Sequence, residues 1–285
     1  MAAIPTVRRR MLGLELRKLR CAAELTAEEA SDRMGWHPTK MSRIEYGRTG
    51  LKPHDLARVL DIYGVVDVAT KEALTELARH SRLRVWWAPY SDVVSRRYAD
   101  YLAFEAEATS ARSHQVTLVP GLLQTPDYAR TVTRSLSPVS TPSQVDALVD
   151  VRLARQAATL SRSTPLELWA IVDESALRRV IGGPATMRRQ LQHLLAVSEQ
   201  PNITLQVLPF ASGAHAGLLG SFVILEFPIP GDLDVVYVEE QTSNLFIERD
   251  DDLKTYSSTF DLLRAAAADV EPSRDLMHTI AKDLK

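Results

Sequence analysis

Residues 26–48 contain the pattern of two short helices joined by a glycine turn. Thr26 is followed three residues later by Glu29, the spacing at which a hydroxyl and a carboxylate cap the first turn of a helix reciprocally. Gly35 can supply the left-handed residue that ends such a helix, and Pro38 fits the first turn of the next helix, where no backbone N–H is needed. The pattern predicts a compact helix-turn-helix pair.

The second helix of this pair has an apolar face and a polar face. Met41 and Ile44 are three residues apart and are expected to face inward, and Gly47 ends the helix. Any helical bundle can contain two short helices around a glycine. Here, however, the outward positions carry hydrogen-bond donors whose length suits base edges and phosphates, which favours DNA binding. These positions are Thr39, Lys40, Ser42 and Arg43.

The pair resembles the lambda-repressor class (Cro/CI, or XRE) of DNA-binding domains. The segment LTAEEAS (25–31) is similar to the start of the first helix in that family, and MSRIEYGR (41–48) is similar to its recognition helix and exit. Two positions depart from the family: Ala27 replaces a Gln that usually contacts DNA, and His37 stands where Ser or Thr is common. The resemblance implies a transcription regulator that places this second helix in the major groove.

Individual residues of the pair can be assigned expected roles. Lys40 and Arg43 are expected to read bases, with a preference for guanine, and the loop flanked by Arg48 and Lys52 should follow a phosphate strand. The full predicted DNA-binding set is Thr26, His37, Pro38, Thr39, Lys40, Ser42, Arg43, Arg48 and Lys52. Since one module reaches only a few base pairs, we expect a homodimer on two half-sites of double-stranded DNA, with centres roughly 34–36 Å or a multiple apart.

In the resembling family, an Arg at the end of the preceding helix pairs with the Glu of the recognition-helix exit. The corresponding residues here are Arg20 and Glu45, which predicts a partly buried structural ion pair. Further helices are predicted for residues 6–23, 53–63 and 68–82. Together these patterns predict an all-α, five-helix, lambda-repressor-like domain over residues 1–82.

The distribution of charge and the number of cysteines restrict the classes of protein to which this chain can belong. The formal net charge is −2, yet residues 1–84 contain 16 Lys and Arg against 11 Asp and Glu, and residues 85–285 contain 18 against 25. Positive charge near the helix pair is what phosphate binding requires. Cys21 is the only cysteine, which excludes an intrachain disulfide and a zinc site built on paired cysteines. Neither a signal-peptide pattern nor a run of roughly 18 apolar residues is found, so we expect a cytoplasmic protein outside membranes.

Residues 83–97 break the helical period and are expected to form a linker. The domain that follows, residues 98–285, begins with predicted helices at 98–113 and 143–160 around an apolar loop at 119–130. Strands are predicted at 166–172, 203–209, 220–227, 234–240 and 244–248, and further helices at 174–181, 185–197, 250–267 and 273–283. Strands clustered after helices favour an α+β domain with a mainly antiparallel sheet.

This second domain also resembles a known family, the domain found behind XRE modules in many actinobacterial regulators. The resemblance is carried by VPGLLQTPDYAR (119–130), VRLARQ (151–156), DESALRRVIGG (173–183), LPFASGAHAGLLGSF (208–222) and VVYVEEQTSNLFIE (235–248). Such regulators are often described as antitoxin-like and are accompanied by a small partner protein. The resemblance implies a domain that senses a small molecule or binds a partner protein, and it assigns no role to single residues.

Acidic residues and a histidine offer a chemical alternative. The candidates are Asp173, Glu174, His215, Glu239 and Glu240, since carboxylates and histidine can bind a metal or act in acid-base catalysis. However, Asp173 and Glu174 stand where a strand passes into a helix, a position at which acids cap backbone N–H groups. Since no base, nucleophile and orienting group can be named together, we expect no enzyme, no metal and no cofactor.

Three roles stay open for the second domain. It could bind a small molecule beside the loops that contain Gln124, Tyr128 and His215, or it could bind a small partner protein as an antitoxin-like module. The alternative is a hydrolase-like activity fused to a DNA-targeting domain.

Overall fold

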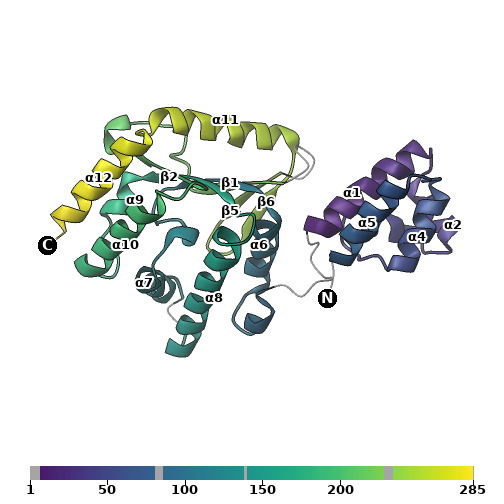
Figure 1. Cartoon of the computed structure of the whole chain (residues 1–285), viewed down its shortest axis with the longest axis horizontal. Helices are drawn as coiled ribbons and strands as arrows, with labels where there is room; N and C mark the ends of the chain where they lie inside the picture. Colours follow the sequence, from purple (N-terminus) through teal and green to yellow (C-terminus); the bar gives the residue numbers. More distant parts are fainter. Residues whose placement is uncertain (1–6, 81–85, 138–139, 228–233, 285) are drawn as a thin grey trace. The chain divides into compact units, whose positions relative to one another are not determined.

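The chain divides into two compact units, Met1–Val85 and Trp86–Lys285 (Figure 1). The computed structural model describes residues 7–80, 86–137, 140–227 and 234–284. The division falls inside the segment expected to be a linker, and the residues from Trp86 onward fold with the second unit, where a short 3-10 helix occupies Ala88–Tyr90.

The described residues of the first unit form five helices, as the sequence predicts. They are α1 (Val7–Ala22), α2 (Ala27–Met34), α3 (Thr39–Glu45), α4 (Pro53–Ile62) and α5 (Val68–His80). The predicted start of the first helix at residue 6 and the predicted end of the fifth at residue 82 lie outside the described residues. Leucines of α1 and α4 meet Met41 and Ile44 of α3 in one buried cluster, which leaves the opposite face of α3 outside the core.

A six-stranded mixed sheet forms the centre of the second unit, with the strand order β3-β2-β1-β4-β5-β6. The strands are β1 (Ser110–Gln115), β2 (Glu167–Asp173), β3 (Ile203–Leu208), β4 (Phe222–Glu226), β5 (Val235–Glu239) and β6 (Asn244–Ile247). The β1–β2 and β2–β3 pairs are parallel, whereas the other three pairs are antiparallel. The prediction of an α+β domain with a mainly antiparallel sheet is confirmed.

The strand β1 corrects the prediction of a helix over residues 98–113. The observed helix α6 spans Arg96–Glu107 and therefore ends before residue 113, and residues 110–115 are extended. Their sequence, SARSHQ, contains no β-branched residue and carries no alternating apolar pattern. Its pairing with β2 on one side and β4 on the other satisfies backbone groups along both edges, so tertiary pairing overrides local propensity.

A second correction concerns residues 119–130, which were expected to form a loop. Only the first part is irregular, with one 3-10 turn at Gly121–Leu123, and the helix α7 begins at Pro126 and continues to Leu136. Proline at the first position of α7 is compatible with a helix start because its missing N–H would have no intrahelical partner there. The remaining helices are α8 (Pro142–Leu160), α9 (Glu174–Arg178), α10 (Pro184–Val197), α11 (Asp250–Ala266) and α12 (Val270–Asp283).

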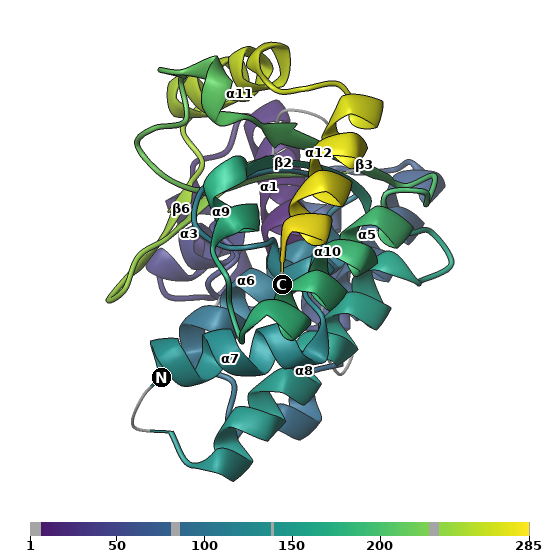
Figure 2. The same cartoon turned by 90° about the vertical axis from the view of Figure 1, so that its left-hand side faces the viewer.

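Helices cover both faces of the sheet. In Figures 1 and 2, α11 lies on one face, and α7, α8 and α10 lie on the other. Phe260 and Leu263 of α11 are buried in one cluster with Ile171, Ile224 and Val236 of the sheet. Among the described helices, none is long and apolar enough to cross a membrane.

Candidate functional site

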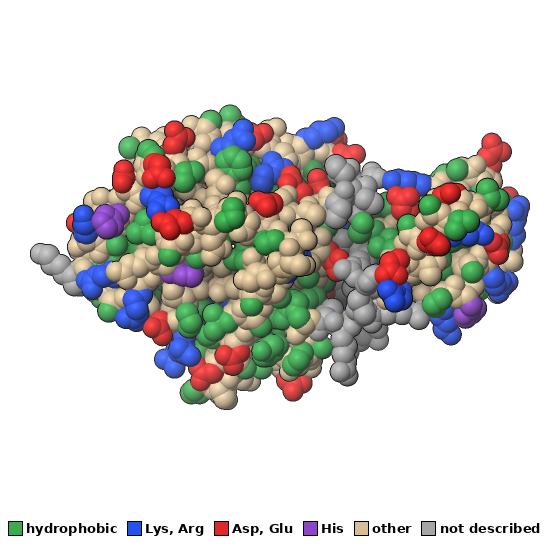
Figure 3. All heavy atoms as spheres, viewed as in Figure 1, with side chains coloured by type: hydrophobic (Ala, Val, Ile, Leu, Met, Phe, Trp, Pro, Cys, Tyr) green, Lys and Arg blue, Asp and Glu red, His purple; other side chains and the backbone are tan. Residues whose placement is uncertain are grey.

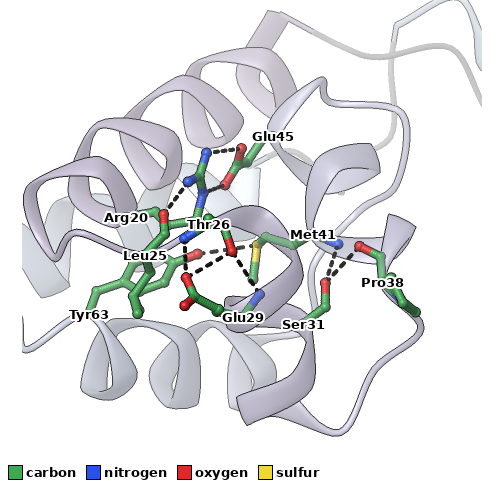
Figure 4. Close-up of polar contacts among 9 residues, drawn as sticks. All are labelled: Arg20, Leu25, Thr26, Glu29, Ser31, Pro38, Met41, Glu45 and Tyr63. Atoms are coloured by element: carbon green, nitrogen blue, oxygen red, sulfur yellow. Dashed lines mark hydrogen bonds and ion pairs between the residues drawn. The ribbon is translucent and has the colours of Figure 1, made fainter.

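The helix α2, which precedes the turn to α3, is held at its N-terminus by the predicted capping box. The Thr26 N–H donates to Glu29 Oε2 at 2.7 Å, and the Glu29 N–H donates to Thr26 Oγ1 at 3.1 Å (Figure 4). The Glu29 carboxylate accepts hydrogen bonds from both the N–H and the hydroxyl of Thr26, and these bonds lower the pKa of Glu29. Gly35 ends α2 in the left-handed conformation, with φ 68°. The hydroxyl of Thr26, a predicted DNA contact, therefore also belongs to the cap.

A buried hydroxyl joins α2 to α3. Ser31 is fully buried, and its Oγ donates to the Pro38 carbonyl at 3.1 Å while it accepts from the Met41 N–H at 3.3 Å (Figure 4). The bond from Met41 satisfies an N–H group of the first turn of α3, which has no intrahelical partner, and the bond to Pro38 ties α2 to the residue that caps α3. Ser31 thereby sets the angle at which α3 leaves the turn. The sequence pattern did not single out this residue.

The predicted DNA-reading residues lie on the side of α3 opposite its buried residues. Thr39 and Arg43 are exposed, and Lys40 and Ser42 are partly exposed. The Lys40 ammonium lies 3.6 Å from the centroid of the Trp36 ring, a cation–π contact that holds the lysine beside the turn. On the face seen in Figure 3, Lys and Arg side chains gather along the edge of the first unit where α2 lies.

The residues on either side of this helix are also open to solvent. His37 and Pro38 are exposed, and His37 Nδ1 lies 3.0 Å from Thr39 Oγ1. After the helix, Arg48 and Lys52 are exposed as well. The Arg48 guanidinium lies 5.5 Å from the ring of Tyr46, which is 57% exposed. Tyr46 is not among the residues predicted from the sequence to contact DNA.

The far end of α3 is fixed to α1 by the ion pair expected between Arg20 and Glu45. Arg20 Nε donates to Glu45 Oε1 at 2.6 Å, and Arg20 Nη2 donates to Oε2 at 3.1 Å (Figure 4). Arg20 also donates to the Leu25 carbonyl. Glu45 is only 7% exposed, and its hydrogen bond raises the pKa of Arg20. Both ends of α3 are therefore held in place, while its polar face is free of core contacts.

In the second unit, two of the sequence motifs pack against each other. Gln156 of α8 donates through Nε2 to the carbonyls of Gly121 and Gln124, at 3.0 and 2.8 Å. Gln124 Nε2 donates to the Val119 carbonyl at 2.7 Å, and the Val119 N–H donates to the hydroxyl of Tyr128 at 3.1 Å. Gln124 and Tyr128, both proposed from sequence as loop residues for a ligand or partner, are buried and hold segment 119–125 in place.

The histidine and the acids of the second unit lie in two places. His215 Nε2 is 3.8 Å from Asp173 Oδ2, and the His215 side chain is 7% exposed. Asp173 Oδ1 also accepts from the Ser175 N–H at 2.8 Å, which caps α9, and Glu174 accepts from the Phe210 N–H at 2.7 Å. Glu239 and Glu240 are exposed at the end of β5. Within the described residues, no group of three or more His, Cys, Asp or Glu side chains is placed to hold a metal ion.

Family models match both units. A model of a helix-turn-helix domain matches residues 11–74, which include α2, α3 and the residues that fix them. The model of the domain of unknown function DUF5753 matches residues 98–279. No curated protein and no solved structure matches the chain significantly. The chain therefore belongs to the DUF5753 family and carries a helix-turn-helix domain of a DNA-binding regulator in front of the family domain.

Proposed function

We propose that this protein is a sequence-specific transcription regulator that binds operator DNA as a homodimer through the outer face of α3. The observation that carries the proposal is the contrast between the two faces of this helix. Met41 and Ile44 are buried, and Ser31 and the Arg20–Glu45 pair fix the ends, while the donors of the opposite face are turned to solvent. A rigid helix with outward donors suits insertion into the major groove.

The charged residues divide into two kinds of contact. Lys40 and Arg43 lie on α3 and are proposed to read guanine through its O6 and N7 acceptors. Lys40 would exchange its contact with Trp36 for the base edge. Arg48 and Lys52 follow α3 and are proposed to bind phosphates, and the exposed Tyr46 is proposed to pack against the sugar-phosphate backbone.

Arg43→Ala tests base reading. The loss of one bidentate contact is expected to weaken operator binding by about 1–3 kcal/mol and to relax specificity at one base pair of each half-site. Arg79→Ala is a matched control because Arg79 is exposed and already pairs with Glu76 at 2.6 Å. Affinities are measured by fluorescence anisotropy for duplexes that differ at single positions. Equal losses for all duplexes would assign Arg43 to the backbone instead.

Lys52→Ala tests phosphate binding. Removal of one phosphate contact is expected to weaken binding to every sequence alike and to reduce the slope of log K against log salt by about 1. The measurement is a series of binding isotherms over a range of salt concentrations, with operator and scrambled duplexes. An unchanged slope would contradict a phosphate contact at this residue.

We propose that the second unit regulates this DNA binding by binding a small molecule or a small antitoxin-type partner protein. Ligand sensing is supported by the polar cluster around segment 119–125 and α8. Partner binding is supported by three apolar side chains on one segment, since Phe210, Leu218 and Leu219 are exposed.

Purification of the intact chain from native extract separates the two roles. A stoichiometric small protein that is lost after Leu218→Ser and Leu219→Ser substitution supports partner binding. A released small molecule that raises the melting temperature when it is returned supports sensing.

A further inference from the structure

Two arginines one turn apart on α8 differ in how their charge is neutralised. Arg155 is buried and donates through Nε and Nη2 to the two carboxylate oxygens of Glu105, each at 2.6 Å. Burial lowers the pKa of Arg155, but the Glu105 charge and hydrogen bonds outweigh this effect and raise it. The charge of Arg155 is therefore neutralised by Glu105 in a structural ion pair.

Arg152 has no such partner. Its Nη1 donates a hydrogen bond to the neutral Gln124 Oε1, and its Nε is shielded from solvent without a hydrogen-bond partner. Among the described residues, no Asp or Glu oxygen lies within 4 Å of its guanidinium. Burial lowers the pKa of Arg152, and the neighbouring charge of Arg155 lowers it further. A charge that is shielded from solvent without a counter-ion costs free energy, so binding of an anion beside Arg152 would be favourable.

The position of Arg152 in the fold matches that of a ligand site. Segment 119–125, which carries Gln124, follows the carboxyl end of β1. The strand order reverses beside β1, because β2 and β3 lie on one side of it and β4 begins the series on the other side. Ligands of sheets with parallel strands bind outside the carboxyl ends of the strands at such switch points. The Arg152 side chain as a whole is partly exposed, so a small molecule can reach it.

We propose that Arg152 anchors a binding site for the oxyanion group, carboxylate or phosphate, of a small-molecule effector. The guanidinium offers a planar fork of N–H donors that matches two oxygens of such a group. Gln124, held by Val119 and Gln156, keeps that fork oriented from one side. The inference deepens the sensing role proposed above and rests on it for its regulatory meaning, whereas anion binding itself is independent of DNA.

Glu239 is the carboxylate that must be distinguished from an external anion. Its charge raises the pKa of Arg152, although it stays beyond ion-pair distance and is exposed at the end of β5. If Glu239 neutralised Arg152 in solution, its removal would destabilise the protein. We expect instead that Glu239→Gln leaves the melting temperature without added anion unchanged.

The test uses the full-length protein with sodium phosphate or sodium acetate, against sodium chloride at equal ionic strength. At least one of the two oxyanions is expected to raise the melting temperature and to bind in isothermal titration. Arg152→Gln should weaken this binding about tenfold or more, the size of a lost charge-assisted hydrogen bond. Arg134→Gln is the matched control, since Arg134 is exposed on α7 and loses the same charge. If only phosphate or only acetate stabilises and binds the protein, the result identifies the anchored group as a phosphate or as a carboxylate.

Arg152→Lys keeps the charge but not the fork, and it is expected to bind the anion several-fold more weakly than the wild type. This variant and the wild-type titrations decide the question even if Arg152→Gln does not fold. The proposal is overturned if neither oxyanion stabilises the wild type beyond chloride, if Arg152→Lys or Arg152→Gln binds as well as the wild type, or if Glu239→Gln melts at a lower temperature without added anion. All these measurements omit DNA, so their failure is distinguishable from a failure of operator binding.

Discussion

Replacing Gly13 by alanine is expected to destabilise the first unit by about 3 kcal/mol, the upper end of the range for an overpacked core. Gly13 is buried in α1 against the end of α3. A Cβ atom at this position would lie 2.2 Å from the Glu45 carbonyl oxygen and 2.7 Å from that of Ile44. Because both are backbone atoms, no side-chain rotation relieves the overlap. The helix α3 must shift, and operator binding should be lost with it.

The destabilisation expected for Gly13→Ala is opposite in sign to the usual effect of this substitution in a helix. Within a helix, a Gly→Ala change ordinarily stabilises by roughly 1 kcal/mol. Gly50→Ala is a control in the same unit for the stability measurement alone, because its Cβ would meet only the Arg9 side chain, at 3.5 Å. Hydrogen exchange of α1 and α3 peptides in the full chain, together with a mobility-shift assay, measures both consequences. A Gly13→Ala protein as protected as the wild type would show that α1 and α3 are not packed so closely.

Glu105→Ala is expected to destabilise the second unit by about 3–5 kcal/mol, the cost of leaving a buried charge without its partner. Arg155, which Glu105 neutralises, also donates to the hydroxyls of Tyr98 and Tyr101, at 3.3 and 3.2 Å. Those hydroxyl acceptors cannot replace a carboxylate, since a phenol hydroxyl carries no charge at neutral pH. The loss should therefore fall on α6 and α8 together.

A double variant separates charge from packing in this cluster. Glu105→Leu combined with Arg155→Met removes both charges at similar volume and should recover most of the stability lost in Glu105→Ala. The free energy of opening is measured from hydrogen exchange of peptides in residues 96–107 and 142–160. If Glu105→Ala exchanges like the wild type, or if the double variant is no better, the buried pair does not carry this stability.

The helix-turn-helix unit could be predicted from sequence because its signals are local. The Thr26–Glu29 capping box, the left-handed Gly35 and the apolar spacing of Met41 and Ile44 each act within a few residues, and each is present in the structure. Strand β1 could not be predicted in the same way. Its conformation comes from pairing with β2 and β4, whose partner residues lie more than 50 positions further along the chain.

The residues that complete the sites were missed for a related reason. Ser31 looks like an ordinary serine within a helix until Pro38 and Met41 are brought against it. Arg152 and Arg155 look equivalent in the sequence, and only the fold assigns the Glu105 carboxylate to one of them. In contrast, family resemblance gave the Arg20–Glu45 pair, which the spacing of the two residues alone would not have identified.

Equilibrium binding of the intact protein to duplexes selected from a random library tests sequence reading by α3 most directly. Measured at one fixed salt concentration, the selected duplexes should share a two-fold symmetric site with half-sites roughly 34–36 Å or a multiple apart. They should bind at least about 1,000-fold more tightly than scrambled duplexes of the same composition. A DNA-reading role for Thr39, Lys40, Ser42 and Arg43 would be contradicted if selection enriched no sequence and if selected and scrambled duplexes bound with equal affinity.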